Sequence, residues 1–321
     1  MTRLDFRMPK VAGRLGLGIG MDMPWGGDIS FVCREQGDGI SERLEHFLAR
    51  HHGQFSHIFF AYQPKSRNQL RVSDYQAAYD ALISAAADIP VRALHHTILN
   101  TGACEAYDRE QILAFTNELC ERYRLSWVVE DLGIWTLRGK SLPYPLPPVL
   151  TPGGLKAAVS NVDWVQRRLA VPLTVEFPGF TEGASFTVGT MDAYEFFRVV
   201  VEDTGSPATL DVGHLLSYQW LRGRTGERMF EGLEGLPLNN TFDLHLSGCQ
   251  ITSEGKYRDL HHGLLLNEQL ALTEWLLPRC PNLRAITYED PKYDAEGVIL
   301  PKAQRNYLRL RTITETWKTT H

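Results

Sequence analysis

The stretch ATLDVGHLLSY (residues 208–218) changes its pattern in the middle. Its first residues form the short apolar run that is typical of a buried parallel strand, and the residues after Asp211 have the composition of a helix. Asp211 occupies the position of a helix N-cap, and His214 follows three residues later. Two interpretations are open at this point. Asp211 caps the helix beside an incidental histidine, or the two residues form half of a metal site.

The same strand-then-helix pattern recurs along the chain. Eight short apolar runs are predicted to be strands, at residues 13–19, 57–62, 92–97, 126–131, 173–177, 208–212, 241–246 and 284–289. Five of the intervening helices have recognisable starts, at Ser41, Ser73, Asp108, Thr151–Pro152 and Asn267. Eight β–α units predict an α/β fold, namely a single (β/α)8 TIM barrel whose one domain spans residues 1–321.

An open doubly wound sheet is the alternative fold for this pattern. That fold is expected to show a glycine-rich dinucleotide fingerprint after its first strand. GLGIGMDMPWGG (16–27) supplies glycines, but their spacing is wrong and no acidic partner stands in the right place. The prolines of SLPYPLPPVLTPGG (141–154) argue against a helix or a central strand, so we expect a loop over one mouth of the barrel.

Composition limits the functional class. With 43% hydrophobic and 22% charged residues, the 321-residue chain has the composition of a globular protein with a large core. The formal net charge of −5 argues against a nucleic-acid surface, which needs a basic stripe. The five cysteines include no CxxC pair, which favours a reduced protein. No segment has the pattern of a signal peptide or a membrane span, so we expect the protein in the cytoplasm.

Potential metal ligands gather at the predicted strand ends and in the loops that follow them. In chain order they are His95, Asp131, Glu176, Asp211, His214, His245, Asp259, His261 and Glu289. The carboxyl ends of barrel strands face one mouth, where catalytic residues of TIM barrels project. A buried polar group without partners costs roughly 2–7 kcal/mol, and converging carboxylates repel each other. Cations would solve both problems, and imidazole together with carboxylate suits zinc, iron or manganese.

Single histidines and aspartates have simpler explanations. A lone histidine in a strand is more often a hydrogen-bonded core residue than a ligand, and we place His51, His52 and His57 in that class. For Asp259 and His261 the metal interpretation is favoured, because in an extended loop residues two apart face the same side. The set as a whole predicts a metal centre.

The ordered series of ligands resembles the three-metal site of the xylose-isomerase-like TIM-barrel superfamily, as in endonuclease IV. A closer resemblance is to the multinuclear non-heme iron-dependent oxidases, the family of methanobactin and 3-thiaglutamate biosynthetic enzymes. The segments that carry it are LHHTILNTG (94–102), VVEDLGIW (128–135), LPYPLPPVLTPGGLKAAVSNVDWVQRRLAVPLTVEFPGF (142–180), TLDVGHLLSY (209–218), FDLHLSGC (242–249), DLHHG (259–263) and ITYEDP (286–291). The resemblance runs from the third predicted strand to the eighth.

The chain also departs from the oxidase pattern. The oxidases usually carry a histidine soon after the first strand and a Glu-Val-His segment on the second, and these places read MDMPWGG (21–27) and FFAYQP (59–64). Four further positions differ: Asp131 stands for an expected histidine, Phe177 and His214 for asparagines, and Cys249 for a common second histidine. The resemblance therefore implies a retained metal core and a changed substrate-facing shell, as in a divergent member of the family.

The resemblance also implies a cofactor and residue roles. The cofactor would be two or three iron ions in a mixed-valent Fe(II)/Fe(III) state, with O2 as co-substrate. Glu176 would bridge two irons, one of them also bound by His95 and Asp131, the other by Asp211, His245 and Glu289. His214, Asp259 and His261 would hold the third iron, and His95, Glu176 and Asp211 would be the catalytic residues.

Residues beside the implied ligands are candidates for orienting them. These are His96, Glu130, Tyr288 and Asp290, because a ligating histidine needs a hydrogen-bond acceptor to fix its tautomer. A polar rim without a special role is the alternative for all four. Cys249 is favoured as a small apolar filler over a metal neighbour.

The implied activity is the oxidation of a cysteine-containing peptide or an amino-acid-derived small molecule in natural-product biosynthesis, with a leader-binding protein as a further implied partner. We expect neither nucleic acid nor a membrane as partner. Three alternatives stay open: a zinc or manganese hydrolase of the endonuclease IV type, a sugar isomerase or epimerase, and a peptide-binding barrel without metal. An isomerase would need a base, for which Lys256 is a weak candidate.

Overall fold

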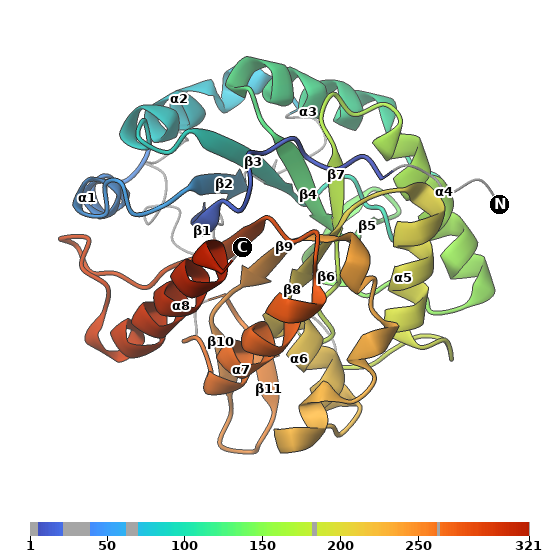
Figure 1. Ribbon diagram of the computed structural model, residues 1–321. Coiled ribbons are helices and arrows are strands. Elements are labelled where there is room, and N and C mark those ends of the chain that lie inside the picture. Colours follow the sequence, from blue (N-terminus) through green and yellow to red (C-terminus); the bar gives the residue numbers. More distant parts are fainter. Residues whose placement is uncertain (1–5, 22–38, 62–69, 182–184, 262–263, 321) are drawn as a thin grey trace.

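The computed structural model describes residues 6–21, 39–61, 70–181, 185–261 and 264–320. Eight parallel strands close into a barrel in the order β1-β12-β9-β8-β7-β4-β3-β2 (Figure 1). The barrel strands are β1 (Gly16–Met21), β2 (His57–Ala61), β3 (Val91–His96), β4 (Trp127–Asp131), β7 (Leu173–Glu176), β8 (Ala208–Asp211), β9 (Thr241–Leu246) and β12 (Ala285–Glu289). All eight predicted strands and the TIM barrel are confirmed, and the open doubly wound sheet is excluded.

Helices form a layer around the barrel (Figure 1). They are α1 (Glu42–Arg50), α2 (Gln76–Ala85), α3 (Glu110–Tyr123), α4 (Pro152–Gln166), α5 (Ala193–Thr204), α6 (Val212–Leu221), α7 (Asn267–Leu276) and α8 (Pro301–Thr319). The predicted N-caps Ser41 and Thr151 are confirmed, because their side chains accept hydrogen bonds from the backbone N–H groups of Leu44 and Gly154.

The other three predicted helix starts are displaced. Ser73 lies in a 3₁₀ turn, Val72–Asp74, that precedes α2, so the prediction of a cap at Ser73 was wrong. Asp108 stands two residues before α3, and its carboxylate accepts from the backbone N–H of Glu110. Asn267 is the first residue inside α7. In each case the helix start differs by one or two residues from the predicted one, because helix ends are the least reliable part of a pattern.

The glycines of β1 serve packing. A Cβ atom added to Gly18 would lie 2.2 Å from the Nε2 atom of His57, and one added to Gly20 would lie 2.2 Å from the ring of Phe59. The two β2 side chains therefore fill space inside the barrel that β1 leaves free. This is the physical reason for a glycine-rich first strand without a dinucleotide fingerprint.

Two antiparallel hairpins extend from the carboxyl ends of barrel strands. β5 (Ile134–Leu137) pairs with β6 (Lys140–Leu146) after β4, and β10 (Cys249–Ile251) pairs with β11 (Tyr257–Asp259) after β9. The prediction of a continuous loop over residues 141–154 was therefore wrong at both ends. A two-stranded sheet tolerates prolines because its outer edge needs no partner, and Pro152 suits the first turn of α4.

Within the described residues, no helix combines the length and apolarity that crossing a bilayer requires. The assignment of residues 1–321 to one domain stays a prediction.

Candidate metal centre

The ends of the barrel strands direct acidic and imidazole side chains into the barrel mouth. Because side chains alternate along a strand, one residue near each of these ends faces inward while its neighbour faces the helices. Six strand-end residues are buried in this way: His95, Asp131, Glu176, Asp211, His245 and Glu289. In the register of the barrel, Asp131 lies beside Glu176 and Asp211 lies beside His245.

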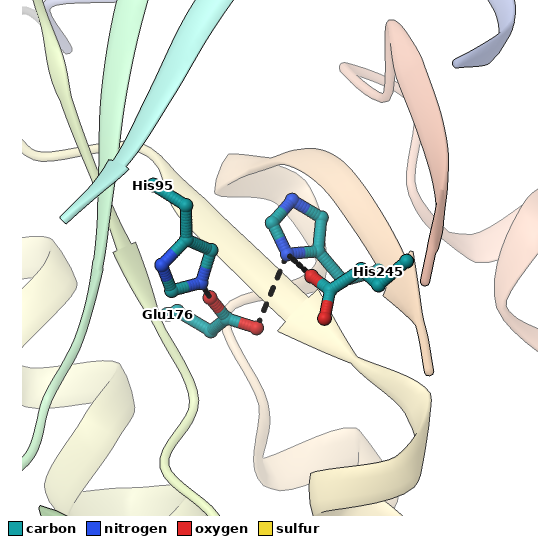
Figure 2. Close-up of side chains that lie close together, drawn as sticks. His95, Glu176 and His245 are labelled. Carbon is teal, nitrogen blue, oxygen red and sulfur yellow. Dashed lines mark hydrogen bonds and ion pairs between the residues drawn. The ribbon is translucent and has the colours of Figure 1, made fainter. Parts of the chain in front are cut away.

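Glu176 is central to the first group of candidate ligands. Its Oε2 atom lies 2.7 Å from His95 Nε2, and its Oε1 atom lies 3.3 Å from His245 Nδ1 (Figure 2). Glu289 Oε1 approaches the same His245 nitrogen to 2.6 Å. Ligand atoms of His95, Glu176, His245 and Glu289 all lie within 4.8 Å of one another, so these four buried residues can hold a metal ion.

Charge in this group is strongly coupled. Burial by itself lowers the pKa of His95, but the carboxylates of Glu176, Asp131 and Glu289 together outweigh burial and raise that pKa to about 10. Burial also opposes protonation of His245, yet Glu176 and Asp243 raise its pKa well above the ordinary value. The pKa of Glu176 is raised by burial but lowered further by His245 and His95, and it ends well below its usual range. The group thus requires positive charge, which protons supply in metal-free protein and a cation would supply instead.

Two observations show that the residues fit a metal. His245 Nδ1 and Glu289 Oε1 lie 2.6 Å apart, yet neither atom makes a hydrogen bond of acceptable geometry with a described residue. Asp211 Oδ2 is also buried and has no hydrogen-bond partner within the described part of the chain. Buried polar atoms are normally hydrogen-bonded, so converging buried atoms that lack hydrogen-bond geometry fit a ligand site.

A second set of candidate ligands follows β8 and β9. His214, in the first turn of α6, lies with Nε2 3.8 Å from Asp259 Oδ2, and His261 Nε2 lies 3.9 Å from Asp259 Oδ1. These three residues form a group with ligand atoms within 4.8 Å. His261 has a left-handed backbone, with φ of 52°, so the expectation of an extended loop around it was wrong. The side chains converge nonetheless.

His214 also borders a third group, with Asp131 and Glu176. Its Nδ1 atom lies 2.7 Å from the backbone oxygen of Phe177, and a carbonyl oxygen can only accept. Nδ1 therefore carries the proton, and the Nε2 lone pair points to the side of Asp259. Of the two groups that contain His214, the one with Asp259 and His261 is chemically the better site.

Asp211 resolves the question raised by its sequence context. Its Oδ1 atom accepts from the backbone N–H of His214 at 2.8 Å, so Asp211 is the N-cap of α6. It belongs to none of the three groups formed among the described residues. Its second oxygen is the buried Oδ2 described above, and burial followed by the nearby carboxylates of Asp259, Glu289 and Glu176 raises its pKa well above the ordinary value, although His214 opposes the shift.

The distances partition the ligands differently from the resemblance. His95 lies with His245 and Glu289, where the resemblance pairs it with Asp131. Asp131 lies with Glu176 and His214. The central position of Glu176 and the trio of His214, Asp259 and His261 agree with the implied arrangement. The role of each residue as a ligand stays a prediction.

Asp243 and Thr287 lie beside the candidate ligands but were not predicted from the sequence as site residues. Asp243 Oδ2 lies 3.1 Å from His245 Nε2, on the side of the imidazole away from the other candidate ligands, and Thr287 Oγ1 lies 3.2 Å from Asp243 Oδ1. The available signal was spacing, because Asp243 and Thr287 each precede a candidate ligand by two residues on the same strand and so face the same way.

Three of the four candidates for orienting the ligands have other partners, and the orienting role of Asp290 stays a prediction. Glu130 accepts hydrogen bonds from the backbone N–H groups of residues 98–100, so it fixes the loop after β3. His96 Nε2 bonds Thr116, and burial, followed by repulsion from His95, lowers its pKa to about 3. Tyr288 is buried and packs against Tyr307.

The remaining candidates have local roles. Cys249 is buried, its sulfur accepts from the Tyr257 hydroxyl at 2.8 Å, and it belongs to none of the three ligand groups of the described residues, so its role as a filler stays a prediction. Lys256 is exposed and pairs with Glu254, which makes it unsuitable as a buried base. His57 bonds Ser56 and Thr287 in the barrel core, as expected for a structural histidine. Residues 22–27 and 62–64, where the chain departs from the oxidase pattern, lie outside the described residues.

Comparison with known proteins identifies the family of the chain. Residues 39–301 match the family model described as RiPP precursor modification enzyme MbnB/TglH/ChrH. A UPF0276 protein of Paraburkholderia phytofirmans is 29% identical over 175 residues, which are 54% of this chain and 53% of the relative. The match thus spans about half the length of that curated relative.

Among solved structures, the chain is similar to a D-psicose 3-epimerase of Clostridium cellulolyticum H10, with a TM-score of 0.51, 12% identity, and coverage of 94% of this chain and 96% of that one. The chain is also similar to a putative sugar phosphate isomerase/epimerase of Anabaena variabilis. The TM-score is 0.53 and the identity 12%, and the match covers 92% of this chain and 99% of that one. At these identities the likeness shows the fold alone, a TIM barrel. Because the family model covers most of the chain, the chain belongs to the MbnB/TglH/ChrH family.

Proposed function

We propose that this member of the MbnB/TglH/ChrH family is a multinuclear, iron-dependent oxidase that uses O2 to modify a cysteine-containing peptide. The observation that carries the proposal is the convergence of buried ligand groups on one carboxylate. Glu176 belongs to two of the three groups formed by the described residues, which suits a residue shared between metal ions. The family supports a peptide as substrate.

The chain's residues would divide the work as follows. His95, Glu176, His245 and Glu289 would hold one ion, and His214, Asp259 and His261 would hold another. Glu176, with Asp131 beside it, would lie between the two ions and be shared by them. Asp211 would add its Oδ2 atom, which takes no part in capping α6. Iron bound there would supply redox chemistry with O2 and a binding position for a substrate thiolate.

Burial sets where a substrate can approach. The side chains of Glu176, His245 and Asp259 are 0–1% exposed, whereas that of His261 is 25% exposed. The buried carboxylates and imidazoles exclude water from the centre and hold the ligand atoms in place. A peptide would therefore reach the centre on the side of His261.

Anaerobic reconstitution tests the proposal. Protein loaded with Fe(II) and partly oxidised is expected to bind at least two irons, to give a mixed-valent EPR signal, and to consume O2 with a cysteine-bearing precursor peptide. The modified peptide would be identified by mass spectrometry, with Glu176→Gln as the matched control because it keeps the side-chain volume. Exclusive zinc binding, with no mixed-valent signal and no O2 uptake, would overturn the oxidase. Cleavage of phosphodiesters or epimerisation of sugars by the zinc or manganese form would assign an alternative function.

A further inference from the structure

A column of buried polar side chains runs through the barrel beneath the metal centre. Ser56 Oγ lies 2.9 Å from His57 Nδ1, and His57 Nε2 lies 3.0 Å from Thr287 Oγ1. Thr287 Oγ1 in turn lies 3.2 Å from Asp243 Oδ1, and Asp243 Oδ2 lies 3.1 Å from His245 Nε2. The column ends at a candidate ligand of the first group.

Donor and acceptor chemistry fixes the direction of each hydrogen bond in the column. As a carboxylate, Asp243 can only accept, so His245 Nε2 and the Thr287 hydroxyl both donate to it. The Thr287 hydroxyl has a single proton, so its oxygen must accept from His57 Nε2. His57 Nδ1 can then accept from the Ser56 hydroxyl at 2.9 Å, and the Leu17 backbone oxygen, 3.2 Å from that hydroxyl, keeps its bond from the backbone N–H of Ser56. With the Ser56 proton directed to His57, the column holds one neutral tautomer of His57.

The directions of these hydrogen bonds fix which ring nitrogen of His245 carries the proton. Its Nε2 atom carries the proton that is given to Asp243, so the lone pair of a neutral His245 lies on Nδ1. Nδ1 is the atom that faces Glu289 at 2.6 Å and Glu176 at 3.3 Å. The column therefore selects the tautomer, and fixes the ring orientation, in which His245 can ligate a metal.

The column occupies a place that packing alone would fill with apolar residues. Other inward residues near it are apolar, such as Phe59, whose ring lies with its centroid 5.2 Å from that of His95 and 5.0 Å from that of His245. Gly18 leaves the room that His57 needs. The barrel thus accommodates a fully paired polar network, which specifies one arrangement more sharply than apolar packing does.

We propose that Asp243 is a positioning residue for the metal centre, that it holds His245 ready to bind through Nδ1, and that Thr287 and His57 hold Asp243 in turn. The inference rests on the metal site of the proposed function, but it requires neither iron nor O2. Partners of this kind behind a ligating histidine contribute roughly 10–100-fold to metal affinity when they are removed one at a time.

Cobalt(II) alone serves as the probe, because its visible absorption reports the number and kind of its ligands. Thr287→Val removes the hydroxyl at constant volume, Thr287→Ser restores it, and Asp243→Asn removes the charge at nearly constant shape. Thr209→Val is the matched control, since Thr209 is a buried barrel threonine whose hydroxyl donates to Thr174 and to no member of the column. The cobalt affinity is measured by chelator competition, and the melting temperature of each metal-free variant checks folding.

The expected result is a roughly 10–100-fold weaker cobalt affinity and an altered cobalt spectrum for Thr287→Val and Asp243→Asn, with recovery in Thr287→Ser and no change in Thr209→Val. If Thr287→Val does not fold, the cobalt affinity and spectrum of Asp243→Asn decide whether the positioning role holds. Wild-type affinity and spectrum in the folded variants would overturn the positioning role and leave the proposed function intact. Failure of the wild-type protein to bind cobalt at all would overturn the metal centre and the inference together.

Discussion

The Glu176 carboxylate lies 2.7 Å from the His95 imidazole, measured from Oε2 to Nε2. Its other oxygen, Oε1, faces His245, whose strand β9 lies across the barrel from β3 (Figure 2). One carboxylate thus joins side chains from β3 and β9, two strands that are not neighbours in the sheet. We therefore expect the loss of this carboxylate to affect more of the candidate ligand groups than the loss of a residue that belongs to only one of them.

Glu176→Gln and Glu289→Gln should therefore differ in metal content. Glu176 belongs to two ligand groups of the described residues and Glu289 to one. We expect Glu176→Gln to lose more metal per chain than Glu289→Gln, measured by elemental analysis after reconstitution and desalting. Both changes keep the side-chain volume, so circular dichroism should show the same fold in both. Equal losses would contradict the shared role of Glu176.

The strand positions and most of the candidate site could be predicted from the sequence for one physical reason. Buried parallel strands are short apolar runs, and their carboxyl ends meet at one mouth, so a histidine or carboxylate at such an end has a predictable location. His95, Glu176 and Asp211 lie at the mouth as predicted.

Features that depend on tertiary contacts could not be predicted in this way. The partition of ligands follows from distances across the barrel, and the proton position on His214 follows from the Phe177 carbonyl. The β6 strand forms because β5 lies beside it, although its own prolines disfavour a strand. Spacing places Asp243 on the same face of β9 as His245, but its role follows only from the contact between the two side chains.

Asp211→Asn should stabilise the metal-free protein and weaken metal binding. Burial raises the pKa of Asp211 well above its ordinary value, so the carboxylate costs stability at every pH above the pKa it has in the unfolded chain. Asparagine removes this cost and caps a helix about as well as aspartate, so the bond to the N–H of His214 is retained. Thermal unfolding at pH 7.5, with and without cobalt, measures both effects.

The control for that variant is Asp192→Asn, at the N-cap of α5. Asp192 caps its helix in the same way but lies at the partly exposed surface, so the metal-free melting temperature should not rise there. A lower metal-free melting temperature for Asp211→Asn would contradict the argument from charge.

His57 should make the stability depend on pH in the acid range. Burial lowers its pKa from 6.5 to about 4, with a smaller opposing effect of Asp243 and a reinforcing one of His245. The unfolded chain therefore takes up a proton near pH 6.5 and the folded protein only near pH 4, so this contribution is complete above pH 6.5 and is lost as the pH falls towards 4. The expected loss is about 3 kcal/mol, from roughly 1.4 kcal/mol per pKa unit.

Denaturant unfolding of the wild-type protein and of His57→Gln at pH 7 and pH 4.5 tests this prediction. Glutamine has no proton to take up in this range, so its stability should fall less between the two pH values. An equal fall in both proteins would assign the acid sensitivity to other groups, of which the buried His96 is the first candidate.

Gly213→Ala should disrupt the group of His214, Asp259 and His261. A Cβ atom at residue 213 would lie 2.4 Å from Asp259 Oδ2 and 2.9 Å from Asp211 Oδ1. Such overpacking costs about 1–3 kcal/mol, which outweighs the gain of up to about 1 kcal/mol from replacing glycine by alanine in a helix. Because the displaced atom is a candidate ligand oxygen, we expect lower metal content as well as lower stability.

Gly153→Ala in α4 supplies the comparison for that change. A Cβ atom at residue 153 would meet only Thr151 Oγ1, at 3.9 Å, so this substitution should leave metal content unchanged and raise stability slightly. Elemental analysis and thermal unfolding of both variants separate the effect of crowding on Asp259 from the general effect of alanine in a helix. If Gly213→Ala matched Gly153→Ala in metal content, the close approach of α6 to Asp259 would have no part in holding a metal.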